Sequence, residues 1–271
     1  MHIATAEVNA TLTTKAGATK AGATLTVHVV LSPDDNIAIT TVTADPPMDL
    51  TVTTWVYAAL ESGQPPCNAT PGHLTDPTAP KCSDSTVGAG VSGDAATWAQ
   101  REPLGNSSSK PITVVIATTV LGSAAAEQNC SKVTDTAATC LVPAVSSLQV
   151  ATVIRSNLDL CGEVEVATST GSCDRDPLQP ALAELLQALN TSSAADVAAA
   201  NAQWWSDYWN ATWVTLPTDP TIEQFYYVHS YLIGAASRAG SVAAGLWGPW
   251  VHSDNPGWAG DFTLGTVSFC I

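Results

Sequence analysis

The 271-residue sequence is poor in charged side chains, and those it has are mostly acidic. Nine lysines and arginines stand against 24 aspartates and glutamates, which gives a formal net charge of −15. Such a surface repels the phosphate backbone of nucleic acids, so we expect no nucleic-acid partner. Acidity of this kind is typical of a protein that stays in solution.

Long hydrophobic runs are also absent, although 45% of the residues are hydrophobic. No run reaches the roughly 18 apolar residues that a transmembrane helix needs. No basic amphipathic stretch is present that would hold the chain on a membrane surface. We therefore expect no membrane segment. The length of the chain is sufficient for one large domain or two ordinary ones.

Several catalytic and metal-binding signatures are missing as well. There is no Cys-x-x-Cys pair and the five histidines are dispersed, so no metal and no cofactor are expected. The Gly-x-Ser-x-Gly motif, which would support a serine nucleophile, is absent from the sequence. The run GAGVSG, Gly88 to Gly93, has the spacing of a dinucleotide-binding loop but lacks the buried strand before it and the helix after it. We interpret it as part of a long loop over 61–110 that holds one weak strand, ATWAQRE.

Seven cysteines are present, and the first six form three neighbouring couples in or beside polar loops. The simplest pairing joins each couple in a disulfide, although other pairings of six cysteines remain open. The couples are Cys67 with Cys82, Cys130 with Cys140, and Cys161 with Cys173, and Cys270 is left over.

Six Asn-x-Ser/Thr sequons accompany these cysteines, at Asn9, Asn68, Asn106, Asn129, Asn190 and Asn210. Together the two features favour an extracellular protein or one of the secretory-pathway lumen. The first residues, MHIATAEVNATLTT, have neither the basic nor the apolar region of a signal peptide. We therefore expect the natural chain to start upstream.

Residues 1–173 carry only strand signals. In ATLTVHVVL the side chains of Leu25, Val27, Val29 and Leu31 fall on one face of a strand. Further strands are predicted at IAITTVTA, LTVTTWVY, PITVVIATTVL and LQVATVIRS. Short strands at this spacing predict an antiparallel β-sandwich.

Helical periodicity begins after residue 173. One helix is predicted over 176–190, a second from the N-cap Ser193 to Trp213, and a third after the cap Asp219 and Pro220. The third helix is expected to bury one face that includes a core histidine. That face consists of Ile222, Phe225, His229, Leu232, Ile233 and Ala236.

Tryptophan is concentrated in this helical part, where seven of the nine tryptophans lie between Trp204 and Trp258. Indole rings stack on the apolar faces of sugars while carboxylates bind their hydroxyl groups, so the pattern favours a glycan site. The candidate acids are Asp207, Asp219, Glu223, Asp254 and Asp261. Asp219 and Glu223 have an alternative interpretation as helix N-terminal residues.

Three segments carry a resemblance to a known family: WWSDYWNATWVTLPTD, FYYVHSYLIGAASRAG and GLWGPWVHSDNPGWAGDFTL. They are similar to the region that joins the β-sandwich to the helical barrel in glycoside hydrolase family 95, known for α-L-fucosidases. The earlier LSPDDNIAITTVTA also resembles its sandwich. The resemblance implies a β-sandwich over 1–173, a helical linker over 174–195, and the start of an (α/α)6 barrel over 196–271.

The resemblance also implies an inverting mechanism, in which a glutamic acid protonates the leaving group and an asparagine, backed by an acidic residue, activates water. In the family an Asn-x-Asn motif follows Gly-Asp-aromatic-x-Leu. Here GDFTL is followed by Gly265 and Val267 at the asparagine positions. We therefore expect a truncated fragment without catalytic residues, whose glycan wall comprises Trp247, Trp250, Trp258 and Asp261.

Two other functions remain open at this point. The threonine-rich β part could be a non-catalytic module that binds glycans or belongs to a cell-surface assembly. A structural extracellular glycoprotein is the third interpretation, which the organised helices and clustered tryptophans disfavour.

Overall fold

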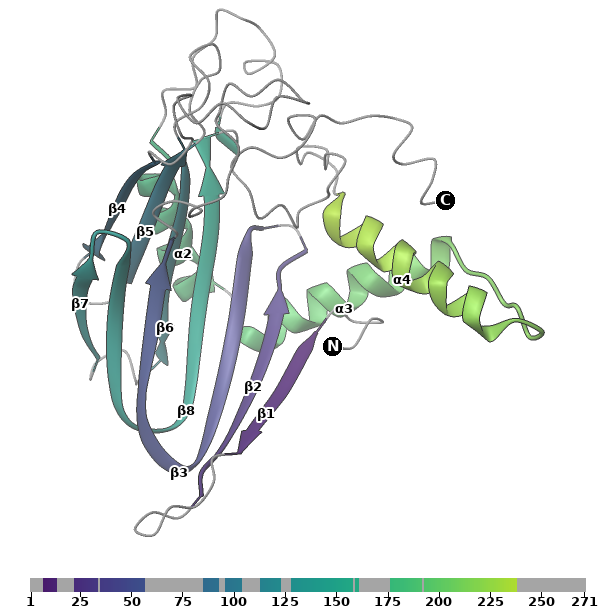
Figure 1. Cartoon of the computed structure of the whole chain (residues 1–271), viewed down its shortest axis with the longest axis horizontal. Coiled ribbons are helices and arrows are strands. Elements are labelled where there is room, and N and C mark those ends of the chain that lie inside the picture. Colours follow the sequence, from purple (N-terminus) through teal and green to yellow (C-terminus); the bar gives the residue numbers. More distant parts are fainter. Residues whose placement is uncertain are drawn as a thin grey trace, which may run out of the picture.

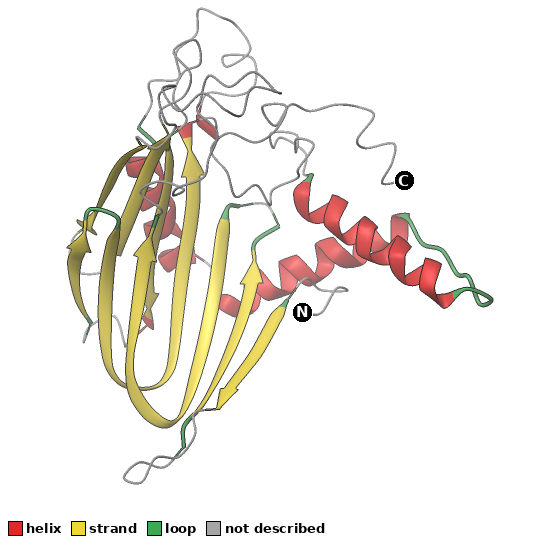
Figure 2. Cartoon of the chain, viewed as in Figure 1, coloured by secondary structure: helices red, strands yellow, loops and turns green. Residues whose placement is uncertain are grey.

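The structure is a computed structural model that describes residues 7–13, 22–33, 35–56, 85–92, 96–103, 113–122, 128–157, 159–160, 176–191 and 193–237. Within these residues, eight strands come first and three long helices follow (Figures 1 and 2). This order confirms the predicted β part followed by a helical part. The two-sheet sandwich, the (α/α)6 barrel and the domain bounds stay predictions.

The strands are β1 (Val8–Thr13), β2 (Thr24–Leu31), β3 (Ile37–Trp55), β4 (Ser85–Ser92), β5 (Ala96–Pro103), β6 (Val114–Leu121), β7 (Asn129–Thr134) and β8 (Ala137–Ser156). The helices are α2 (Leu178–Thr191), α3 (Ala194–Ala211) and α4 (Pro220–Ala236).

All the described strands join one antiparallel sheet in the order β1-β2-β3-β8-β6-β5-β4, with β7 also paired to β8. Two strands in its centre are unusually long, with 19 residues in β3 and 20 in β8. They pair along nearly their whole length, from Ile37 opposite Val153 to Trp55 opposite Ala137. The two halves of β8 therefore have different second neighbours, because β7 pairs with its first half and β6 with its second.

The long strands bend at the same level, so the sheet folds back on itself (Figure 1). In β3 the register shifts on both sides of Met48, beside two prolines that have no N–H to donate to the ladder. In β8 the bend includes Ala144, whose φ of 48° lies in the left-handed region. The Ala144 N–H donates to Asp49 Oδ1 at 2.9 Å, which ties the two bends together.

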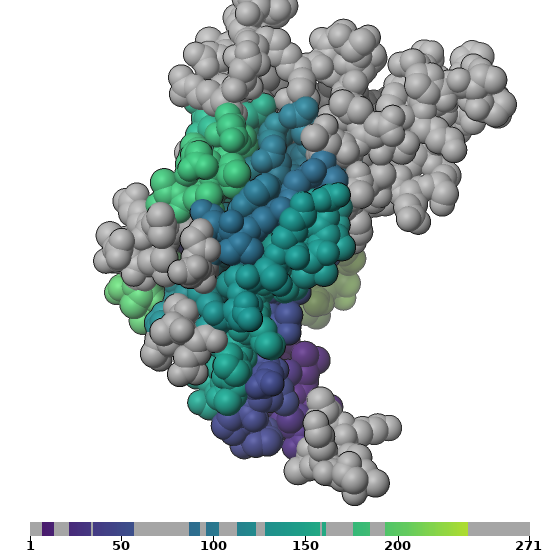
Figure 3. Space-filling view, turned by 90° about the vertical axis from the view of Figure 1, so that its left-hand side faces the viewer, coloured from purple at the N-terminus to yellow at the C-terminus, as the bar shows by residue number. Residues whose placement is uncertain are grey.

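The folded-back limb packs on β4, β5 and β6. The hydroxyl groups of Thr54 and Thr97 share a buried hydrogen bond of 2.7 Å between these limbs. Two clusters fill the space, one of alanines around Ala99 and one of branched side chains around Val142. In Figure 3 the blue strands β4 and β5 lie against the teal strands β7 and β8, with the green helix α2 beside them.

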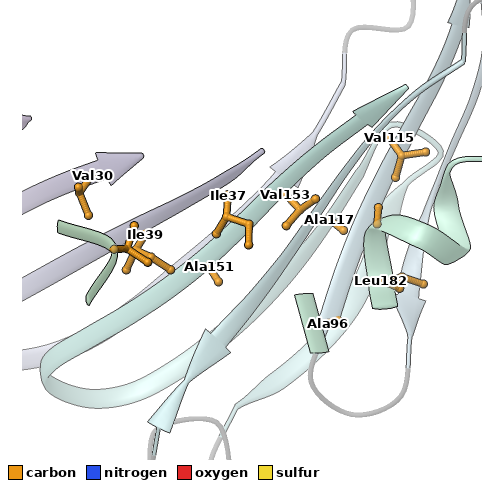
Figure 4. Close-up of a cluster of buried hydrophobic side chains, with 11 residues drawn as sticks. Val30, Ile37, Ile39, Ala96, Val115, Ala117, Ala151, Val153 and Leu182 are labelled. Atoms are coloured by element: carbon orange, nitrogen blue, oxygen red, sulfur yellow. The ribbon is translucent and has the colours of Figure 1, made fainter. Parts of the chain in front are cut away.

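The opposite face of the sheet packs on the helices (Figure 4). Leu182 of α2 and Val197 of α3 join a cluster whose strand members include Val30, Val115 and Val153. Beside it, Arg155 Nε donates to Glu184 Oε2 at 2.5 Å and so ties β8 to α2. Burial of branched side chains on this face, worth roughly 1.5–3 kcal/mol for each, positions the helical part.

The four side chains predicted to share one face of β2 do so, but the most deeply buried side chain of the strand, Val30, lies on the other face. Val30 is 2% exposed, whereas Leu31 is 52% exposed. The reason is that α3 covers the face of Val30 through Val197. The alternation of side chains along one strand cannot show which of its two faces a helix later in the chain will cover.

The prediction of a long loop over 61–110 is partly wrong, because residues 85–92 form the edge strand β4. The indole ring of Trp98 on β5 lies across Gly88 and Gly90. A Cβ atom at Gly90 would lie 2.9 Å from Trp98 Cζ2, closer than such atoms approach. These glycines therefore make room for an indole ring. Their place in an edge strand agrees with the interpretation that GAGVSG is not a dinucleotide-binding loop. The predicted strand at 96–102 is confirmed as β5.

Candidate functional site

The candidate site lies on a hairpin of α3 and α4, which extends away from the sheet in Figure 1. Local signals start both helices where the sequence predicted. Ser193 and Asp196 form a capping box, with Asp196 N–H donating to Ser193 Oγ at 3.2 Å and Ser193 N–H donating to Asp196 Oδ2 at 3.0 Å. Asp219 caps α4 by accepting from Ile222 N–H at 3.1 Å, and Pro220 follows in the first turn.

Aromatic rings of α3 and α4 pack against one another, with Trp205 stacked on Tyr231 and Trp209 edge-on to Tyr227. Trp205, 1% exposed, lies at the centre. Its ring centroid is 5.4 Å from Tyr208, 5.7 Å from Trp209 and 5.2 Å from Tyr231 of α4. Gly234 allows the close approach, since a Cβ there would lie 3.0 Å from Tyr208 Cζ. Such aromatic pairs add about 0.5–1.5 kcal/mol each beyond their buried area.

Tyrosine hydroxyl groups bind the backbone around this cluster. The Tyr208 hydroxyl donates to the Ser230 carbonyl oxygen at 2.7 Å, and Tyr227 donates to that of Val214 at 2.9 Å. Burial, and secondarily the nearby Tyr226, raises the pKa of the Tyr208 hydroxyl. These two hydrogen bonds therefore help to fix the connection between α3 and α4.

The acids of this hairpin also have structural partners. Glu223 Oε2 accepts from Leu216 N–H at 2.6 Å, and Asp207 Oδ1 accepts from Gln203 Nε2 at 2.9 Å on an exposed surface. With the cap at Asp219, this confirms the structural alternative for Asp219 and Glu223. Each of these three acids therefore takes part in a local hydrogen bond of the hairpin.

Within the described part of the chain, no group of three or more histidine, cysteine or acidic residues could hold a metal ion. None of the helices in that part is long and apolar enough to cross a membrane.

The face predicted for α4 is not the one that packs on α3. Ile222 and Phe225 are 55% and 59% exposed. His229 is exposed too, with its Nδ1 2.8 Å from the Phe225 carbonyl oxygen, so the prediction of a core histidine is wrong. The packed face instead carries Tyr231 and Gly234, because the Tyr231 ring stacks on Trp205 and Gly234 leaves room for the rings of Trp205 and Tyr208.

Sequence reasoning missed this aromatic face, although its signal is present. Tyr227, Tyr231 and Gly234 follow one another at the helical spacing of four and three residues. Tyrosine and glycine rank low on hydrophobicity scales, so the periodicity of apolar residues does not reveal this face.

The disulfide predicted between Cys130 and Cys140 is present. Of the sequon asparagines, Asn9, Asn129 and Asn210 are exposed. Asn190 lies in α2, and its side chain is not described. The other predicted residues lie outside the described part of the chain. They are Asn68, Asn106, Cys67, Cys82, Cys161, Cys173, Cys270, Trp247, Trp250, Asp254, Trp258, Asp261, Gly265 and Val267.

A comparison with models of known protein families gave no match, and a comparison of the sequence with curated proteins gave none either. Solved structures do match the fold. A protein assigned as a kojibiose phosphorylase, from the human microbiome, matches with a TM-score of 0.56 and 10% identity over 86% of this chain and 27% of that protein.

A family GH92 alpha-mannosidase from Bacteroides thetaiotaomicron matches in two structures, one in complex with mannoimidazole. The TM-scores are 0.33 and 0.32, with 7% and 8% identity over 78% of this chain and 23% and 24% of that enzyme. These two scores are too low to establish a common fold. The chain therefore shares its fold with one segment of the protein assigned as a kojibiose phosphorylase, and this segment makes up 27% of that protein's length.

Proposed function

We propose that the chain is part of a secreted glycoside hydrolase that resembles family 95 and acts on α-L-fucosides or related glycans by inversion. The observation that carries the proposal is the folded β-sheet continued by an aromatic helix hairpin. This architecture matches a protein assigned as a kojibiose phosphorylase over 86% of the chain. The resemblance of the helical segments to family 95 supports the substrate class.

The chain itself is proposed to bind glycan without cleaving it. Caps and backbone groups hold Asp196, Asp219 and Glu223, and the Gln203 side chain donates to Asp207. Gly265 and Val267 occupy the positions at which the family has its catalytic asparagines. A catalytic constellation needs every group held in place, so loss of these groups removes turnover. The proposed sugar contacts are Trp247, Trp250, Trp258 and Asp261.

Ligand titration of the 271-residue chain tests this proposal. Binding of an α-L-fucosyl oligosaccharide, followed by tryptophan fluorescence, should weaken about tenfold in Trp258→Ala, because one ring stack is lost. Trp55→Ala is the matched control, since this exposed tryptophan lies on β3. Equal binding by both variants would refute the proposed wall, and release of nitrophenol from a nitrophenyl α-L-fucoside would refute the lack of turnover.

One observation favours a second function, a glycan-binding face on the sheet. Two adjacent rows of polar side chains cross the same face of four strands. One row is Thr11, Thr26, Thr43 and Ser147, and the other is Asn9, His28, Thr41 and Gln149. These residues are exposed or half-buried, and their hydroxyl, amide and imidazole groups can form hydrogen bonds with a glycan.

A pair of threonine variants separates this function from the first. Thr26→Val removes a hydroxyl from the polar rows, while Thr40→Val removes one from the opposite face of β3. On a glycan array, selective loss of signal in Thr26→Val would support binding by the sheet. Loss in Trp258→Ala with no effect of Thr26→Val would favour the helical part.

A further inference from the structure

One sequon of this chain contains a disulfide cysteine. Asn129, Cys130 and Ser131 all lie within β7, and Cys130 is bonded to Cys140 of β8. The two cysteines are direct partners in the antiparallel ladder, with Cα atoms 4.0 Å apart. On the two sides of this bond, Asn129 pairs with Leu141 and Ser131 with Thr139.

We propose that N-glycosylation of Asn129 and closure of the Cys130–Cys140 disulfide compete, so that oxidation of the β7–β8 hairpin sets the fraction of chains with a glycan there. The proposal rests on the secretory location included in the proposed function. It concerns modification of the chain and is independent of any catalytic activity.

The two reactions need different shapes of the same tripeptide. In the first, the thiols of Cys130 and Cys140 pass two electrons and two protons to a donor protein disulfide, which becomes two thiols as the new S–S bond forms. In the second, the Asn129 amide nitrogen bonds to C1 of a lipid-linked oligosaccharide. The bond from C1 to the lipid diphosphate breaks, and the nitrogen loses a proton. A sequon held extended in a closed ladder cannot bend into the transferase.

The hairpin is local and therefore closes early. Its turn is short, at Asp135 and Thr136, and is supported by a 2.6 Å ion pair between Lys132 Nζ and Asp135 Oδ1. A hairpin forms within about 1–10 μs, but an isolated two-stranded hairpin is only marginally stable. The closed shape thus stays reversible until the disulfide fixes it.

The times of synthesis and oxidation overlap. Cys130 and Cys140 are 10 residues apart in sequence. Synthesis of that many residues takes on the order of 1 s, and disulfide formation takes seconds or longer. Neither reaction is always first, which predicts partial occupancy of Asn129.

The finished fold accepts either outcome. The side chain of Asn129 is exposed, so an attached glycan projects into solvent. Asn9 and Asn210 are exposed as well, and their sequons contain alanine in place of the cysteine. They serve as internal controls in the same molecule.

The test directs the full chain into the secretory pathway of a eukaryotic cell and measures glycan occupancy of each sequon by mass spectrometry. Cys140→Ser and Cys130→Ser both leave a valid sequon and prevent the disulfide. In each variant we expect occupancy of Asn129 to rise about twofold or more, since the competing step is removed. Occupancy of Asn9 and Asn210 should stay at the wild-type value.

Measurement on newly made, cell-associated chains keeps the test valid even if a variant folds poorly. Full occupancy of Asn129 in the wild-type chain would overturn the proposal. So would an unchanged occupancy in both cysteine variants, including zero in all chains. An equal rise at all the sequons would likewise count against it, because the effect would then come from general misfolding.

Discussion

Replacement of Gly234 by valine tests whether the aromatic contact fixes the α3–α4 hairpin. The contact leaves no room for a side chain, since a Cβ at this position would lie 3.0 Å from Tyr208 Cζ and 3.2 Å from Trp205 Cη2. Trp205 cannot easily shift, because it is 1% exposed and surrounded by other rings. Gly234→Val should therefore push α4 away from α3.

The expected loss can be worked out from two opposing effects. Overpacking of a tight contact costs about 1–3 kcal/mol, while replacing a helical glycine regains about 0.5 kcal/mol of helix propensity. The net loss in the free energy of unfolding is about 0.5–2.5 kcal/mol, or a shift of up to about 1 M in the urea midpoint. Tryptophan fluorescence and near-ultraviolet circular dichroism would follow the change directly at Trp205.

Ala235→Val is the matched control, because it adds the same branch to the next residue of α4, which is exposed. Its effect should stay within about 0.5 kcal/mol. In a Tyr208→Ala background, Gly234→Val should cost less, since the ring that it displaces is gone. Equal urea midpoints for Gly234→Val and Ala235→Val would refute the reasoning.

Three further outcomes are expected. Glu184→Ala should lose about 1.5–3 kcal/mol in urea unfolding by removing the half-buried partner of Arg155, and a loss under about 0.5 kcal/mol would show a mere surface pair. Hydrogen bonds from Ser193 hold the pKa of the Asp196 carboxyl below its ordinary 3.8. The cap should therefore stabilise α3 fully above pH 3.8 and be lost as the pH falls further. An acid titration by far-ultraviolet circular dichroism should show this fall in the wild-type chain and a smaller one in Ser193→Ala, which keeps the backbone N–H donor. Burial raises the pKa of Tyr208 above 10.0, so its contribution to stability is full below pH 10 and falls at higher pH. Ultraviolet titration should show a late-ionising tyrosine that Tyr208→Phe removes, and an unchanged curve would contradict the assigned burial.

The helices could be predicted closely because their signals are local. Ser193 and Asp219 cap α3 and α4 within a few residues of themselves, and Pro220 suits only a first turn. The Cys130–Cys140 pair is local in the same sense. Prediction succeeded where the residue type itself marks the local structure, as capping residues and neighbouring cysteines do.

The features that could not be predicted depend on partners in other strands or helices. Gly90 weakens strand propensity, and only Trp98 on the neighbouring strand explains why a glycine is needed there. The strand β7 is short and polar, so its strand character comes from pairing with β8. On α4, the choice between two faces was decided by the rings of α3, which a hydrophobic scale does not represent. For the proposed sugar wall, the structure adds the hairpin that precedes it, and Trp258 and Asp261 stay predictions.

The bend in β3 and β8 has a consequence for how the molecule comes apart. Both strands continue through the bend of the sheet, so β3 and β8 belong to both limbs and their shared hydrogen-bond ladder joins one limb to the other. Neither limb can separate while the other stays intact, and the sheet should therefore lose structure as one cooperative unit. The α3–α4 hairpin contacts the sheet at β2 through the first turns of α3, so it can open at a lower free energy than the sheet. On heating or in denaturant we therefore expect the aromatic hairpin to open before the strands separate.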